Sequence, residues 1–214
     1  MFLKSLSRTL QFEGEEPQTR AKYQRLLCLL IFSSLVFFLG LFAEEVNTLF
    51  AFQREKLESG QLWRAITCNL VHLSSNHMFM NLCVYVLTTL IFAAGVSIAA
   101  WYGVLAFSSL CVGGGLYFFD SGVSTYVGLS GAIYGMLAFG LLVNLRNHGL
   151  TYFVAYLFVI YRVLSQQTAS YDPVEMADFI GGNVIASAHL IGLVAGNLSA
   201  VVWFVSRYGV RVKS

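Results

Sequence analysis

The chain has 214 residues, of which 57% are hydrophobic and only 11% are charged, and its formal net charge is +2. An average soluble domain carries roughly 25% charged residues, so this composition excludes an ordinary soluble domain and indicates an all-α integral membrane protein. The four cysteines are scattered, without a CxxC pair or metal-ligand spacing. We therefore expect no disulfide, no metal site, no cofactor and no nucleic-acid partner.

Apolar runs along the chain predict one domain of six membrane-spanning helices, residues 26–206. It follows a polar segment, residues 1–25, that lacks the apolar core of a signal peptide. The first run, Leu26 to Ala43, is just long enough for a hydrocarbon layer that needs about 20 residues. The fifth run is short enough to be tilted or partly re-entrant. The other five runs cover residues 77–95, 98–119, 129–145, 150–164 and 184–205. A polar tail, residues 207–214, follows the last of them.

Two polar loops separate these runs, and the basic residues orient them. We expect the long loop 44–75 to lie along the membrane interface, and the loop 165–183 is acidic. With the N-terminus in the cytoplasm, most of the lysines and arginines fall on the inner side, as the positive-inside rule requires. Both termini are then cytoplasmic, and the fourth helix begins near the outer surface. The basic residues on the outer side are only Arg54, Lys56, Arg64 and Arg162.

Three stretches place polar residues where hydrocarbon disfavours them. They are "HLSSNHMFMN" before and within the second helix, "GLSG" at the start of the fourth, and "SAHLIGLVAG" in the sixth. Polar residues inside a membrane usually face a cavity or each other. His77 and Asn81 are four residues apart and share one helix face. Gly192 and Gly196 form a small-xxx-small surface that lets the sixth helix approach a neighbour closely.

Ser130 is the candidate nucleophile, because Gly128 and Gly131 clear space around it and allow close approach from the fourth helix. A serine needs a base to become nucleophilic, and His189 can supply one across the contact of the fourth and sixth helices. Tyr134 lies one turn after Ser130 and can orient the imidazole by stacking. These stretches contain no carboxylate, so we expect a Ser–His dyad rather than a triad.

The developing oxyanion needs hydrogen-bond donors, and the sequence offers two kinds. Backbone N–H groups are unpaired where the fourth helix begins, and they face a developing negative charge. The side chains of His77 and Asn81 can donate from the second helix.

Each residue also has a purely structural interpretation. A serine in a membrane helix commonly bonds to its own backbone, and His189 or Asn81 can simply hold helices together. His72, before the second helix, more plausibly supports its loop than takes part in chemistry. The coincidence of all three stretches in one small bundle favours the catalytic interpretation.

In these residues the sequence resembles the rhomboid family of intramembrane serine proteases, from about residue 50 to residue 204. The resemblance rests on Trp63–Arg64, His77-x-x-x-Asn81, Gly128-x-Ser130-Gly131 with Tyr134, and Ala188–His189 followed by Gly192 and Gly196. It implies that Ser130 is the nucleophile and His189 the base. It also implies an oxyanion hole of His77, Asn81 and the Ser130 N–H, and a loop-supporting role for His72. Such enzymes cleave membrane-anchored proteins near the outer surface, through a cavity open to that side.

A finer resemblance is to the bacterial rhombosortases, seen in "QREKLESGQLWRAITCNLVHLSSNH", "STYVGLSG" and "GGNVIASAHLIG". It implies a protein of the bacterial inner membrane that removes a C-terminal sorting segment from exported proteins. That segment is a glycine-rich motif, one membrane helix and a basic tail. Tyr134 is a departure, because many rhombosortases have histidine there and general rhomboids have tyrosine.

Three further functions stay open beside the rhombosortase interpretation. A general rhomboid protease would cleave other membrane-spanning substrates. A catalytically dead relative would bind clients without cutting them, although such proteins lose the serine or the histidine and this chain keeps both. A small transporter would be expected to show repeats, broken helices or a charged pathway, and none of these is evident in the sequence.

Overall fold

The computed structural model describes residues 17–208, and almost all of its regular structure is helical. Within the described residues, four helices are long and apolar enough to cross a membrane. The protein is therefore an all-α multi-pass membrane protein, as its composition predicts. These four helices are α2 (Pro17–Leu41), α6 (Ser75–Phe92), α7 (Ile98–Phe119) and α10 (Ala186–Tyr208).

A fifth long helix, α8 (Ser130–Ser165), is bent into two arms at Gly149. Gly149 has φ +48° and ψ −124°, a backbone conformation that glycine adopts without the clash that a Cβ atom would cause. The spans predicted at residues 129–145 and 150–164 fall in these two arms. Whether both arms cross the bilayer, as the count of six spans requires, stays a prediction.

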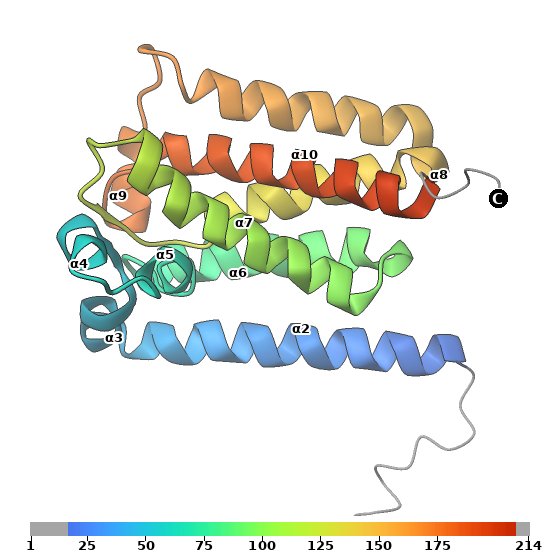
Figure 1. Ribbon diagram of the computed structural model, residues 1–214, viewed down its shortest axis with the longest axis horizontal. Coiled ribbons are helices and arrows are strands. Elements are labelled where there is room, and N and C mark those ends of the chain that lie inside the picture. The colour runs from blue at the N-terminus through green and yellow to red at the C-terminus, as the bar shows by residue number, and fades with distance from the viewer. Residues whose placement is uncertain (1–16, 209–214) are drawn as a thin grey trace, which may run out of the picture.

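The long helices run side by side, and the short elements gather at one end of the bundle, on the left in Figure 1. The N-terminal end of α2 and the C-terminal end of α10 both lie at the opposite end of the bundle. That both termini share one side of the membrane stays a prediction. The short elements are α3 (Ala43–Phe50), α4 (Arg54–Glu58), α5 (Arg64–Thr67), η1 (Ala93–Gly95) and α9 (Val174–Ile180). Of these, only η1 lies apart from that end, directly after α6.

The predicted loop 44–75 is thus more structured than its sequence suggests, because it contains α4, α5, strand β1 (Phe52–Gln53) and all of α3 except its first residue. Strand β1 pairs antiparallel with β2 (Thr125–Tyr126), which directly precedes α8. Similarly, the acidic loop 165–183 contains α9. The sequence signal for these elements is weak because none has more than eight residues.

Trp63 and Arg64 secure the C-terminal end of α3. The buried Arg64 guanidinium donates to the carbonyls of Thr48 and Ala51 at 2.7 and 2.8 Å, and Trp63 Nε1 donates to the Leu49 carbonyl at 3.1 Å. The last carbonyls of a helix have no partner within it, so these bonds satisfy groups that would otherwise be unpaired. This explains why a tryptophan–arginine pair stands in an otherwise modestly polar loop.

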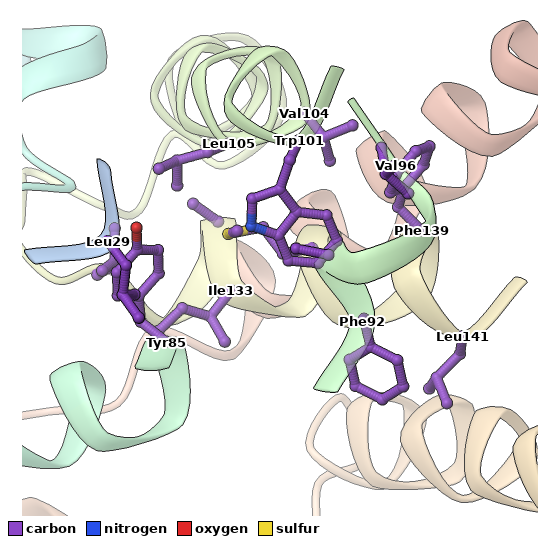
Figure 2. Close-up of a cluster of buried hydrophobic side chains, with 14 of the residues drawn as sticks. Leu29, Tyr85, Phe92, Val96, Trp101, Val104, Leu105, Ile133, Phe139 and Leu141 are labelled. Atoms are coloured by element: carbon purple, nitrogen blue, oxygen red, sulfur yellow. The ribbon is translucent and has the colours of Figure 1, made fainter. Parts of the chain in front are cut away.

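The main core lies between α6, α7 and the first arm of α8, with contributions from α2 and α10. Trp101 is its largest buried side chain, and the close-up in Figure 2 shows it among aliphatic and aromatic residues of the neighbouring helices. Its indole Nε1 donates to Thr89 Oγ1 at 3.2 Å, so the one polar atom of the ring is satisfied. Outside this core, α2 exposes a row of large apolar residues, which indicates contact with lipid. They include Leu27, Leu30, Ile31, Phe38 and Leu41.

Candidate active site

Ser130 is the first residue of α8 and follows strand β2 and a short turn. The turn before it is fixed by two hydrogen bonds: the Gly128 N–H donates to the Cys68 carbonyl at 3.0 Å, and the buried Tyr126 hydroxyl donates to the Gly128 carbonyl at 2.7 Å. The first N–H groups of a helix have no acceptor within it. The start of α8 therefore presents N–H groups without a helical acceptor, of which that of Gly131 interacts with the Tyr126 hydroxyl, and the positive end of the helix dipole next to Ser130.

His189 lies one turn into α10 and is 8% exposed. Its Nε2 atom lies 2.8 Å from Ser130 Oγ, so the two residues predicted to form a dyad share a hydrogen bond. A neutral imidazole with a free lone pair on Nε2 can accept the serine proton in this geometry.

The dyad forms because α8 and α10 are in backbone contact. A Cβ atom on Gly192 would collide with the Gly131 carbonyl, and one on Gly196 with the Gly135 carbonyl. Gly131 in turn has no room for a Cβ, which would meet the Ala188 carbonyl at 2.9 Å. The small-residue surface expected on the sixth helix therefore exists, and its partner is the pair Gly131 and Gly135. Gly135 was not singled out from the sequence.

Two further side chains hold the His189 ring. Gln166, buried at the C-terminal end of α8, places its Oε1 atom 2.8 Å from His189 Nδ1. The Tyr134 ring lies beside the imidazole, with centroids 4.7 Å apart and planes inclined by 43°. The contact expected for Tyr134 is present, but the rings are tilted rather than parallel. Gln166 was not foreseen, because nothing near it in sequence distinguishes it from other polar loop residues.

From α6, His77 and Asn81 line the same cavity as Ser130, and both are buried. The Leu73 N–H donates to His77 Nδ1 at 3.4 Å, which leaves Nε2 of a neutral ring as the atom that carries the proton. Asn81 Nδ2 is buried and has no hydrogen-bond partner. Because Asn81 also lines the cavity that contains Ser130, its Nδ2 atom is available to an acceptor that enters this cavity.

Gly128 brings these two donors close to the start of α8. A Cβ atom there would lie 2.9 Å from His77 Nε2 and 3.7 Å from Asn81 Nδ2, and the φ of +131° already disfavours any other residue. Of the two glycines beside Ser130, Gly131 therefore makes room for α10, and Gly128 makes room for the α6 side chains.

His72 contacts His77 and α3 rather than the dyad. Its ring packs edge-on against His77 with centroids 5.0 Å apart, and its carbonyl accepts a 3.0 Å hydrogen bond from Asn47 of α3. Both ring nitrogens are buried without a partner, and burial, with a smaller effect of His77, lowers the pKa of His72 to about 3. His72 is therefore neutral at physiological pH, and it has no contact with Ser130 or His189 among those described.

A cavity of about 870 Å³ connects these groups. Its wall includes the dyad, His77, Asn81 and Gln166, together with parts of α3, α9 and the turn before α8. The cavity extends from α3 and α9, at one end of the bundle, to residues within the long helices such as Val84 of α6 and Leu137 of α8. It is large enough to hold several residues of a peptide beside Ser130.

Two comparisons with known proteins bear on this site. Residues 59–206 match the family model described as the rhomboid domain. A comparison with curated proteins finds no match. The matched region includes Ser130, His189, His77 and Asn81, and it extends over well more than half of the chain.

Proposed function

The chain belongs to the rhomboid family, and from this premise we propose that it is an active intramembrane serine protease with Ser130 as nucleophile and His189 as general base. The observation that carries the proposal is the 2.8 Å contact between Ser130 Oγ and His189 Nε2 on the wall of a large cavity. A structural serine in a membrane helix bonds to a carbonyl of the preceding turn instead, as Ser199 does with the Ala195 carbonyl at 2.9 Å.

The proposed reaction has two halves. Ser130 Oγ attacks the carbonyl carbon of the scissile peptide while His189 Nε2 takes its proton, and the tetrahedral intermediate collapses when the same proton passes to the leaving amine. The product of this half is an ester between Ser130 and the client. Water then attacks the ester with His189 again as base, which releases the new carboxyl terminus and restores the serine.

The negative charge of each tetrahedral intermediate falls on the former carbonyl oxygen. We propose that Asn81 Nδ2, the Nε2–H of His77 and the Ser130 N–H donate to this oxygen. The first two lie close together, since a Cβ atom on Gly128 would be 2.9 Å from His77 Nε2 and 3.7 Å from Asn81 Nδ2. Donors fixed before the reaction stabilise such charge without having to reorganise, which is commonly the largest electrostatic contribution to catalysis.

We propose that clients are membrane-anchored proteins cut near the outer surface. The basic residues Arg146 and Arg207 lie toward the end of the bundle away from the cavity. At the cavity end, the guanidinium of Arg54 binds backbone carbonyls at the end of α7, as Arg64 does at the end of α3. Lys56 and Arg162 are the other basic residues at the cavity end, whereas Arg20, Lys22, Arg25, Arg146 and Arg207 fall toward the opposite end, which the positive-inside rule therefore assigns to the cytoplasm. In a bacterium the cavity then opens to the periplasm.

We further propose that the client carries a glycine-rich segment just outside its membrane helix, followed inside by a basic tail. A peptide bond within a helix is shielded, and exposing its N–H and C=O groups in hydrocarbon costs several kcal/mol each. Glycine is a poor helix former and has no side chain to obstruct attack, so it lowers this cost. The sequence resemblance to rhombosortases supports the same client class.

The test is labelling of the purified protein with a fluorophosphonate probe, together with cleavage of a membrane-anchored reporter. Ser130→Ala and His189→Ala should each lose both reactions, whereas Ser199→Ala, which removes a serine bonded to its own helix, should keep both. Alanine fits at position 130, so we expect the thermal midpoint of Ser130→Ala to stay near that of the wild type. Cleavage by Ser130→Ala at the wild-type rate, or a wild-type protein that neither labels nor cleaves, would overturn the proposal.

A further inference from the structure

Among residues 17–208, Gln166 is the side chain whose hydrogen bond reaches Nδ1 of His189, with 2.8 Å between Oε1 and Nδ1. We infer that Gln166 is a positioning residue that selects the tautomer of His189 and so makes its Nε2 atom available as a base. The inference rests on the proposed protease function and assigns the dyad a third member that is an amide rather than a carboxylate.

An amide oxygen only accepts hydrogen bonds, so contact with Gln166 Oε1 requires a proton on His189 Nδ1. A neutral imidazole has one proton, so Nε2 then carries the lone pair and faces Ser130 Oγ. The opposite tautomer would place an N–H against the serine and an unpaired nitrogen lone pair against the amide oxygen.

The amide itself is held in place. Gln166 is 6% exposed, and its amide also interacts with the Tyr134 hydroxyl, which can accept from the amide N–H group. Tyr134 packs on the same imidazole. The imidazole of His189, the phenol of Tyr134 and the amide of Gln166 therefore restrict one another. With its N–H group directed at Tyr134, the Gln166 amide turns Oε1 toward His189 Nδ1.

No hydrogen bond joins His189 to a carboxylate anywhere in residues 17–208. The other titratable or charged groups that act on the ring are Tyr134 and Arg162 from α8 and His77 from α6. None of them is an anion at neutral pH. Gln166 therefore fixes the tautomer without adding the negative charge that would stabilise the protonated imidazolium.

Gln167 provides a matched control, because it ties the same end of α8 to α10 without touching His189. Its Nε2 atom donates to the carbonyls of Val163 and Ala186 at 3.1 and 2.9 Å. Gln167→Leu removes this tie and Gln166→Leu removes the contact with the imidazole. Comparing the two variants distinguishes the effect of displacing the end of α8 from the effect of changing the tautomer of His189.

The experiment measures three quantities in detergent-solubilised full-length protein: kcat and KM for a reporter, the rate of fluorophosphonate labelling, and the ¹⁵N shifts of the His189 ring. The NMR signal is assigned by its absence in His189→Ala. Groups that orient a functional histidine at metal sites are worth about 10- to 100-fold in activity, and we expect a similar loss of kcat in Gln166→Leu with little change in KM. The His189 spectrum should change from the Nδ1–H form to a mixture of tautomers. Gln167→Leu should resemble the wild type in all three quantities.

Gln166→Glu is the rescuing variant, because a carboxylate also accepts from Nδ1–H. It should keep the Nδ1–H tautomer and recover labelling, and the pH at which the rate falls on acidification should rise, since an anion stabilises imidazolium. A Gln166→Leu protein with wild-type kcat and an unchanged ¹⁵N spectrum would overturn the inference while wild-type labelling still supported the protease. Failure of the protease proposal would appear separately, as absence of labelling in the wild type, and the tautomer measurement would remain valid.

Discussion

Gly131 on α8 and Gly192 on α10 approach so closely that a Cβ atom on Gly192 would overlap the Gly131 carbonyl. The same two helices carry Ser130 and His189. Ser130 and His189 can therefore come within hydrogen-bond distance because Gly131 and Gly192, where the two helices touch, have no side chains.

We expect Gly192→Ala to destabilise the protein and to slow fluorophosphonate labelling. Overpacking a close contact typically costs about 1–3 kcal/mol, and the helices can relieve it only by separating. A displacement of about 1 Å at reacting groups can reduce a rate about 100-fold. Thermal unfolding and the labelling rate measure the two effects.

The matched control is Gly103→Ala on α7, where a Cβ atom would meet nothing within 4 Å. This substitution should leave labelling unchanged and keep or raise stability, because alanine is favoured over glycine in a helix by about 0.5–1 kcal/mol. If Gly192→Ala behaves like Gly103→Ala, the close approach of the helices is not what holds the dyad together.

Asn81→Ala tests whether Asn81 is an oxyanion donor or only joins helices. Loss of one such donor costs about 10² to 10³ in rate, and we expect the smaller figure because His77 and the backbone remain. Asn81 Nδ2 has no partner in the free protein, so its removal should leave the thermal midpoint unchanged or slightly higher. The measurements are kcat for a reporter and thermal unfolding; a lower midpoint with an unchanged kcat would identify Asn81 as a structural residue.

The sequence predicts the features that depend on local patterns. Apolar runs locate every long helix, and the i, i+4 spacing places His77 and Asn81 on one face of α6. The family resemblance is confirmed by the rhomboid domain match. These signals are detectable because hydrocarbon demands long apolar helices and makes each polar residue within them conspicuous.

The features that sequence did not predict depend on packing between distant segments. Gln166 lies in a polar stretch where one more amide attracts no notice, and only the folded chain brings it to His189, 23 residues away. Gly135 similarly has meaning only because Gly196 lies opposite it. The short helices α3, α4 and α5 depend on contacts such as those of Arg64, since helices this short are not stable alone.

Because His72 is buried without a charge, we expect the stability of the folded protein to depend on pH. Burial lowers its pKa in the folded protein to about 3, from an ordinary value near 6.5 in the unfolded chain. The unfolded state therefore binds a proton first, and stability should fall as pH drops below about 6.5, by about 1.4 kcal/mol per pH unit until pH approaches 3. Above pH 6.5 this contribution is constant. Thermal midpoints between pH 4 and 8 should show a weaker slope in His72→Leu than in the wild type, and equal slopes would contradict the prediction.

The last prediction concerns the glycines of the client. They should promote cleavage because they lower the free-energy cost of unwinding the client helix. In a reporter with an outer glycine-rich segment, one membrane helix and a basic tail, replacing the glycines by alanine should reduce kcat/KM, since each alanine stabilises helix by about 1 kcal/mol relative to glycine. Replacement by leucine should reduce it further, because leucine also adds bulk at the scissile bond. The basic tail and the membrane helix stay unchanged in all reporters, so orientation and insertion are matched, and cleavage is measured by mass spectrometry of the released fragment. Undiminished cleavage of both variants would favour a general rhomboid protease, whereas restored cleavage when one pair of glycines is returned would support a protease that reads a glycine-rich sorting segment.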